Sequence, residues 1–91
     1  MSNGNTISGQ VREEVRHLIA ELTEREPGEI TDTALFVDDF GIDSLMAIEI
    51  LVSLDKMYKI DIPEAEFHKI NTVNDAVDAV MRHLSRKTTA G

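Results

Sequence analysis

The chain has 91 residues, no cysteine and a formal net charge of −8, from 17 acidic and nine basic side chains. Its length suits one domain with a small core. The lack of cysteine excludes disulfides, thiolate metal sites and a cysteine nucleophile. The acidity argues against nucleic acid and anionic lipid as partners, because both would repel it. It favours protein partners with basic patches, although the same charge would also serve solubility alone.

We expect no targeting signal in the N-terminal residues. No stretch approaches the ~20 apolar residues of a membrane span, so we expect no membrane insertion. Residues 1–10 are polar and unlike a secretory signal, and we expect a cytoplasmic protein. Residues 1–7 and 85–91 are expected to be flexible tails that flank a folded domain over residues 8–84.

The apolar periodicity of the chain predicts an all-α fold. A first helix is expected to begin at an N-cap, Ser8, and to stop at Pro27 and Gly28. Its apolar face comprises Val11, Val15, Leu18, Ile19 and Leu22. A long connection follows, over residues 26–43. Its apolar side chains are expected to pin it onto the core, namely Ile30, Leu35, Phe36, Val37 and Phe40. A short strand or an extra helical turn inside the connection would also explain its length.

Three further helices follow this connection. One is predicted from Ser44 to about Tyr58, with Asp43 as its N-cap. A short one begins with Pro63 and ends near Lys69 or Ile70. The last is capped by Thr72, and its apolar residues are Val73, Ala76, Val77, Val80, Met81 and Leu84. The expected architecture is a four-helix bundle with three main helices, a short third helix and a long loop between the first two.

Residue types that carry catalysis are sparse. His17, His68 and His83 have no neighbour in sequence that suggests a nucleophile and base pair, and we interpret them as surface histidines. The carboxylates of Asp38, Asp39 and Asp43 lack the spacing of a calcium loop. A glycine-rich phosphate loop is also missing. We therefore predict no catalytic residue and no metal site.

The segment 39–45 combines a turn, a cap and a hydroxyl. Gly41 permits the turn, Asp43 caps the following helix, and Ser44 occupies its first position. A helix N-terminus carries partial positive charge and free N–H groups, so a phosphate ester on Ser44 would be tolerated there. A plain helix cap is the alternative explanation.

The wider sequence resembles the acyl carrier protein family. Gly41-Ile42-Asp43-Ser44-Leu45, followed by Ile48-Glu49, is similar to that family's attachment motif. Upstream, residues 36–41 resemble the end of its long first loop. Downstream, residues 62–64 and 69–73 resemble the starts of its third and fourth helices. The resemblance covers residues 11–84.

This resemblance implies that Ser44 accepts 4′-phosphopantetheine from coenzyme A, through a separate phosphopantetheinyl transferase. The arm ends in a thiol that carries acyl groups as thioesters. The protein would then be a carrier and not an enzyme. Its partners would be acyl-loading enzymes, a ketosynthase and other acyl-processing enzymes with basic patches. We also expect a monomer, because the pattern has no heptad seam.

Two groups of residues are expected to form the site. The attachment motif is Gly41, Ile42, Asp43 and Leu45 around Ser44. In addition to Leu45, the expected partner contacts are Asp39, Met46, Glu49, Asp55, Ile62 and Glu64. Residues 36–68 hold eight acids and two lysines, so most of the excess negative charge lies around the motif. Such charge raises association rates more than affinity.

Other assignments remain open at this stage. Met46 and Ala47 follow Leu45 where fatty-acid carriers often have an acid, which resembles polyketide-synthase carriers. A peptidyl carrier would more often have glycine where Ile42 stands, and a D-alanyl carrier is also possible. An unmodified acidic interaction module, or a small hydrolase using Ser44 directly, would belong to different classes.

Overall fold

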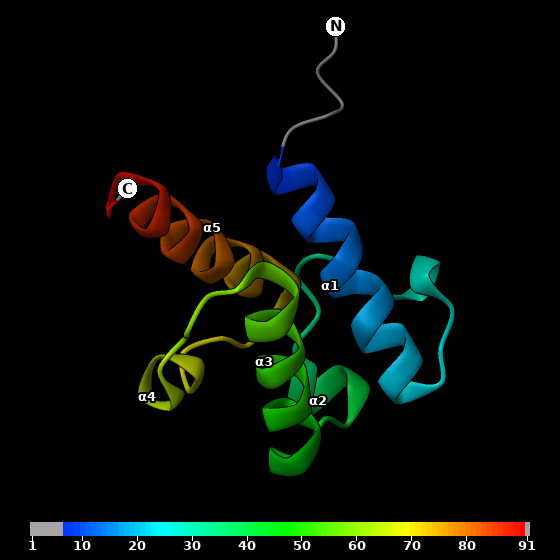
Figure 1. Ribbon diagram of the computed structural model, residues 1–91. Coiled ribbons are helices and arrows are strands. Elements are labelled where there is room, and N and C mark those ends of the chain that lie inside the picture. The colour runs from blue at the N-terminus through cyan, green and yellow to red at the C-terminus, as the bar shows by residue number, and fades with distance from the viewer. Residues whose placement is uncertain (1–6, 91) are drawn as a thin grey trace, which may run out of the picture.

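The computed structural model describes residues 7–90, with side chains as far as Ser85, and within that range it contains helices and no strand. In chain order these are α1 (Ile7–Thr23), the 3₁₀ helix η2 (Pro27–Glu29), α2 (Phe36–Phe40), α3 (Ser44–Tyr58), α4 (Glu64–Phe67) and α5 (Val73–Ala90) (Figure 1). The predicted all-α fold with three main helices is confirmed. The long connection also contains two short helices, η2 and α2.

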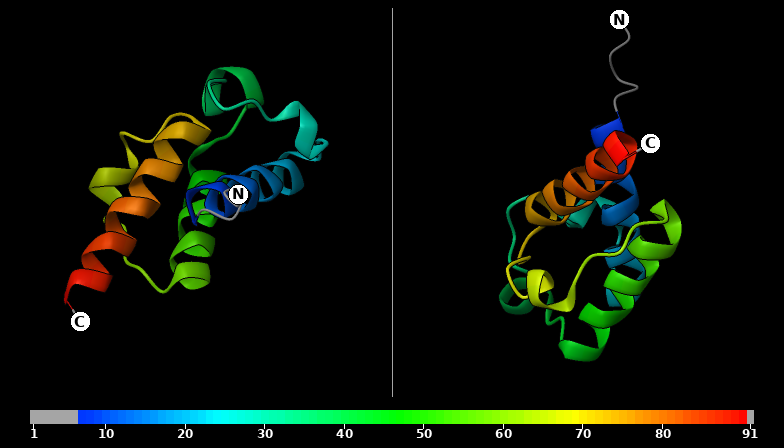
Figure 2. Two further views of the ribbon diagram at one scale, coloured as in Figure 1. Left: turned by 90° about the horizontal axis from the view of Figure 1, so that it is seen from above. Right: turned by 60° about the vertical axis from the view of Figure 1, so that its left-hand side comes forward.

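The core lies where α1, α3 and α5 pack together (Figure 2). Its largest fully buried side chains are Val11, Val15, Ile19, Ile30, Ile50, Leu54, Val73 and Val80. Burying each contributes about 1.5–3 kcal/mol before entropy is subtracted. The start of α1 and the end of α5 lie at one end of the molecule, and the start of α3 lies at the other (Figures 1 and 2).

Several helix ends differ from the predicted ones. Helix α1 ends at Thr23, before Pro27, because Glu24 adopts a left-handed conformation (φ 58°) and the Arg25 N–H donates to Ala20 O at 2.8 Å. Ser8 lies inside α1 and is not its N-cap. Pro63 is the N-cap of α4 and not its first residue.

Helix α5 begins as predicted and ends later than predicted. Thr72 Oγ1 accepts a hydrogen bond from the Asp75 N–H at 3.1 Å, so the predicted cap is confirmed. The helix continues to Ala90, so residues 85–90, which were expected to belong to a flexible tail, are helical. No proline or glycine between residues 73 and 90 stops it. Of the predicted N-terminal tail, residues 1–6 lie outside the described residues, and Ile7 begins α1.

The long connection buries only part of its apolar residues. Ile30, Phe36 and Phe40 are buried, as predicted. Leu35 and Val37 are 42% and 66% exposed, so the expectation that both pack onto the core was wrong. Phe36 and Phe40 are four residues apart on one face of α2, and Val37 lies to the side of that face, where it stays exposed.

A cluster of polar side chains holds the connection against α1 and α5. Arg16 donates from Nε to Ile30 O at 3.0 Å and from Nη2 to Asp32 Oδ1 at 2.7 Å. Arg12 Nη1 donates to Asn74 Oδ1 at 2.6 Å and lies 3.3 Å from Asp32 Oδ1. The Asn74 N–H donates to Asp32 O at 3.2 Å. These four residues, Arg12, Arg16, Asp32 and Asn74, are called the polar anchor below.

Replacing Arg16 with methionine should lower the free energy of unfolding by about 1–3 kcal/mol, because Asp32 and Ile30 O would lose their strongest donors. Urea denaturation followed by circular dichroism measures this change. Lys56→Met is the matched control, since the exposed Lys56 makes no hydrogen bond or ion pair with the described side chains. Equal stability losses in the two variants would contradict the role given to the polar anchor.

Candidate functional site

A left-handed glycine turns the chain from α2 into α3. Gly41 has φ 67°, and its N–H donates to Val37 O at 3.0 Å. The next N–H, from Ile42, donates to Phe36 O at 3.0 Å. Ile42 is only 3% exposed, so its side chain fixes the turn on the core. The chain therefore enters α3 in one defined direction.

Asp43 caps α3 as predicted. Its Oδ1 accepts a hydrogen bond from the Met46 N–H at 2.9 Å, and its backbone is extended (φ −95°, ψ −177°). The predicted helix from Ser44 to Tyr58 is confirmed at both ends. Ser44 is its first residue and is exposed. The sequence therefore places an accessible hydroxyl where the helix dipole favours an anion.

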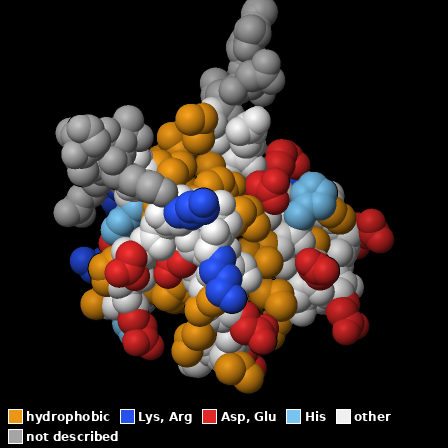
Figure 3. Space-filling view, viewed as in Figure 1, with side chains coloured by type: hydrophobic (Ala, Val, Ile, Leu, Met, Phe, Trp, Pro, Cys, Tyr) orange, Lys and Arg blue, Asp and Glu red, His pale blue; other side chains and the backbone are white. Residues whose placement is uncertain are grey.

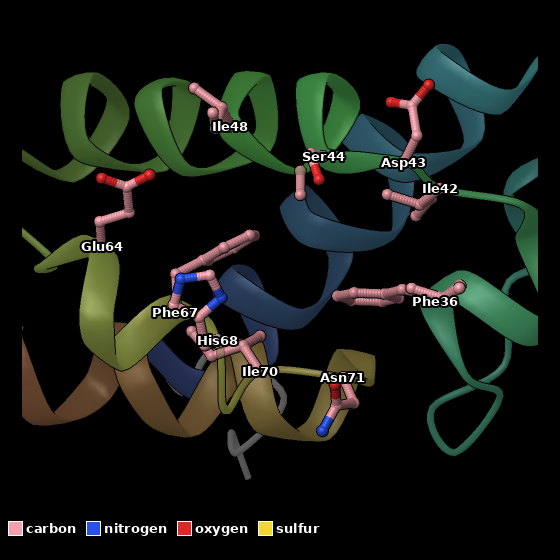
Figure 4. A pocket seen from close by; sticks show the side chains of 12 residues that line it. Phe36, Ile42, Asp43, Ser44, Ile48, Glu64, Phe67, His68, Ile70 and Asn71 are labelled. Atoms are coloured by element: carbon pink, nitrogen blue, oxygen red, sulfur yellow. The ribbon is translucent and has the colours of Figure 1, made fainter.

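A cavity of about 430 Å³ opens beside Ser44. It lies between α2, α3, α4 and the segment that leads into α5 (Figure 4). Its apolar lining comes from Phe36, Val37, Ile42, Ala47, Ile48, Phe67 and Ile70. Its polar groups are those of Asp43, Ser44, Glu64, His68 and Asn71. In Figure 4 the Ser44 side chain lies on the cavity side of α3, while the Asp43 carboxylate points away from it.

Exposed apolar side chains surround the same end of α3. Leu45 is 69% exposed, Ile48 42% and Val52 43%, and their spacing of three and four residues places them along one side of the helix. Val37 of α2 is 66% exposed and lines the cavity. These four residues are called the apolar stripe below. Figure 3 shows apolar and acidic side chains next to one another at the lower end of the molecule, where α3 begins.

Three of the acids predicted as partner contacts are exposed, namely Asp39, Glu49 and Glu64. Asp39 also has a structural task, because its Oδ2 accepts from the Leu35 N–H at 2.7 Å at the start of α2. Glu64 lies on α4, on the far side of the cavity from Ser44 (Figure 4). Their contact with partners stays a prediction.

The other three predicted partner contacts have roles inside the protein. Ile62 is 2% exposed and belongs to the core, so its prediction as a partner contact was wrong. Asp55 is half-buried, and its Oδ1 accepts from the Ile62 N–H at 3.0 Å. Met46 is half-buried against the core. Sequence spacing gave no sign that the segment after α3 folds back onto these residues.

Sequence reasoning placed Ile48 next to the motif but did not assign it or Val52 to an exposed surface, and it missed the cavity residues Phe67 and His68. The apolar residues of α3 cover more than one helical face, and that excess was the available signal. His83 was also misjudged as a surface residue. Its Nε2 lies 2.9 Å from Glu66 Oε1, and its side chain is 13% exposed.

Among the described residues, no group of three or more potential ligand side chains could hold a metal ion. No helix within the described part of the chain is long and apolar enough to cross a membrane.

The fold and the site define a small helical carrier domain with an accessible serine at the start of its second main helix. A family model described as Phosphopantetheine attachment site matches residues 13–80, and the chain belongs to this family. It is a phosphopantetheine carrier of the acyl carrier protein type. In this family the domain is the site of covalent 4′-phosphopantetheine attachment. Such proteins generally shuttle substrates and do not catalyse reactions themselves. They interact with phosphopantetheinyl transferases and with acyl-processing enzymes.

Two solved structures illustrate the similarity. The acyl carrier protein from Enterococcus faecalis matches with a TM-score of 0.75 and 26% identity, over 86% of this chain and 99% of that one. The apo doublet acyl carrier protein from prodigiosin biosynthesis matches with a TM-score of 0.71 and 29% identity. That match covers 90% of this chain and 42% of the doublet.

Substituting alanine for Gly41 should destabilise the protein by about 1 kcal/mol, because a side chain is strained at positive φ. A Cβ added at Gly41 would meet nothing within 4 Å, so the cost comes from the backbone alone. Gly28→Ala is the matched control, with the same open surroundings and no positive φ. Thermal unfolding of both variants measures the difference, and equal melting temperatures would contradict the strain argument.

Proposed function

We propose that Ser44 is the phosphopantetheine attachment residue, and that the chain carries acyl or polyketide-type intermediates as thioesters between separate enzymes. One observation carries the proposal: among the described residues that line the cavity, Ser44 supplies the one hydroxyl, at the exposed first position of α3. The fit of the residues to the group is good. The first N–H groups of a helix lack intrahelical acceptors, so they can donate hydrogen bonds to a phosphate oxygen.

Each residue of the attachment motif has a role in presenting that hydroxyl. Gly41 and the buried Ile42 set the direction of the chain, and Asp43 holds the first turn of α3 through the Met46 N–H. Ser44 is thereby held in one place, while its side chain stays accessible to a transferase. The bound group supplies the thiol that this cysteine-free chain lacks.

Incubation with coenzyme A, magnesium and a broad-specificity phosphopantetheinyl transferase should add the mass of one phosphopantetheine to the intact protein. Ser44→Ala should add none and keep the helical circular dichroism spectrum, because the exposed hydroxyl makes no contact that the fold needs. Ser53→Ala, which removes a hydroxyl from the same helix, should be modified normally. Modification of the Ser44→Ala variant, or none in a folded and initially unmodified chain, would refute the assignment.

The cargo is proposed to be an acyl group and not an amino acid. The apolar cavity lining and the Met46-Ala47 pair after the motif support this choice, as does the similarity to a carrier from prodigiosin biosynthesis. Offering the modified chain to an acyl-activating and an amino-acid-activating enzyme distinguishes the two. Loading by the second alone would favour the peptidyl or D-alanyl alternative.

Partner enzymes are proposed to bind the apolar stripe and the acids beside it. Leu45 is the most exposed member of the stripe and directly follows Ser44. A surface that is apolar at its centre and negatively charged around it suits a partner surface with a pocket and a basic rim. Weak and fast binding fits a carrier that must leave each enzyme after use.

Leu45→Ala should lower kcat/KM for modification by the transferase about tenfold, because an exposed apolar contact next to the reacting hydroxyl is lost. Ile7→Ala is the matched control, since Ile7 is also strongly exposed but lies at the opposite end of the molecule. Its kinetics should match those of the unaltered chain. Equal kinetics for all three proteins would remove Leu45 from the partner surface.

A further inference from the structure

Four exposed side chains form one row along α3, called the α3 row below. They are Leu45, Glu49, Val52 and Lys56, at successive spacings of four, three and four residues. In a helix of about 3.6 residues per turn, their directions lie within roughly 60° of one another around the axis. Apolar and charged residues therefore alternate along the row, and the charge changes from negative at Glu49 to positive at Lys56.

Neither charge of the α3 row is neutralised inside the protein. Among the described side chains, Glu49 and Lys56 have no partner in a hydrogen bond or ion pair. A charge on a helix pairs with an opposite charge three or four residues away. Those positions hold Leu45, Met46, Val52 and Ser53 around Glu49, and Val52, Ser53, Lys59 and Ile60 around Lys56. Seven residues place the two charges about 10 Å apart along the axis, too far to pair with each other.

The acid next to Lys56 in the sequence has a different contact. Asp55 is half-buried, and its Oδ1 accepts from the Ile62 N–H at 3.0 Å. Lys59, which is exposed, follows the last residue of α3. Figure 3 shows basic side chains over this end of α3, with acidic and apolar ones toward its start. The helix dipole would also favour a lysine near the end of α3, and the experiment below separates that role from partner binding.

We propose that the α3 row is a docking surface with both signs of charge, and that Lys56 fits an acidic group on the partner enzyme. The partner presents a basic group to Glu49, an apolar contact to Val52 and, about 10 Å beyond the basic group, an acidic group to Lys56. A partner surface that is basic throughout meets Lys56 with like charge and is disfavoured. That the partner is an acyl-processing enzyme rests on the proposed function; the charge preference of the surface does not.

Two synthetic helical peptides, titrated into the isotope-labelled, unmodified chain and followed by NMR, test this surface. The first peptide has an apolar face with arginines at one end and glutamates about 10 Å further along. The second has arginines in place of the glutamates. The first should bind at least about threefold more tightly, with chemical shift changes along α3. The net charge of −8 alone would favour the second peptide, so the two explanations predict opposite orders of affinity.

Reversing the charge of Lys56 tests its part in the preference. Lys56→Glu should make the second peptide the tighter binder, because the glutamates of the first would then meet like charge. Lys69→Glu is the matched control, since Lys69 is also exposed but follows α4 in the chain. It changes the net charge equally and should leave the preference unaltered. Circular dichroism checks that both variants keep their helices.

Four results would each overturn the proposal. They are no binding of the first peptide, equal or tighter binding of the second by the unaltered chain, the same preference in Lys56→Glu, and an equal change of preference in Lys69→Glu. The titrations use the chain without an arm, so none of them depends on Ser44. The docking surface and the carrier function can therefore fail separately.

Discussion

The double engagement of Arg16 with Ile30 O and Asp32 is the interaction on which the rest of the site depends. The segment between α1 and α3 has twenty residues and little regular structure. Ordering a segment of that length costs much conformational entropy. The polar anchor offsets this cost by joining the segment to α1 through Arg12 and Arg16. Asn74 adds the start of α5 to the same network. Each charged group in it has a partner, so its partial burial costs little.

A series of contacts connects the polar anchor with the site. The Phe36 N–H donates to Asn71 O at 2.8 Å, which joins α2 to the segment before α5. Phe36 and Phe40 then seat α2 on the core, and Gly41 turns the chain toward α3. The position of the serine is thus set by contacts distant from it in sequence. The cavity beside the serine has walls from α2, α3, α4 and the segment before α5, and it exists only when all four are in place.

Local signals made much of the structure predictable from the sequence. Asp43 and Thr72 are caps that act within three residues, so both were identified correctly, as were the bounds of α3. The segment proposed as the attachment motif is local in the same way, since it spans residues 41–45. Contacts between segments that are distant in the sequence have no such local signal. Burial of Ile62, the pairing of His83 with Glu66 and exposure of Val37 all depend on which segments meet, and periodicity within one helix does not report that.

The serine lies at the far end of the molecule from the start of α1 and the end of α5 (Figures 1 and 2). Additional sequence joined at either end would therefore leave the face that holds Ser44 uncovered. Tethering to a neighbour, whether an enzyme or a second carrier, would restrict diffusion without blocking access, and would raise the local concentration of each partner. The fold is thus equally suited to independent use and to repetition within a longer polypeptide.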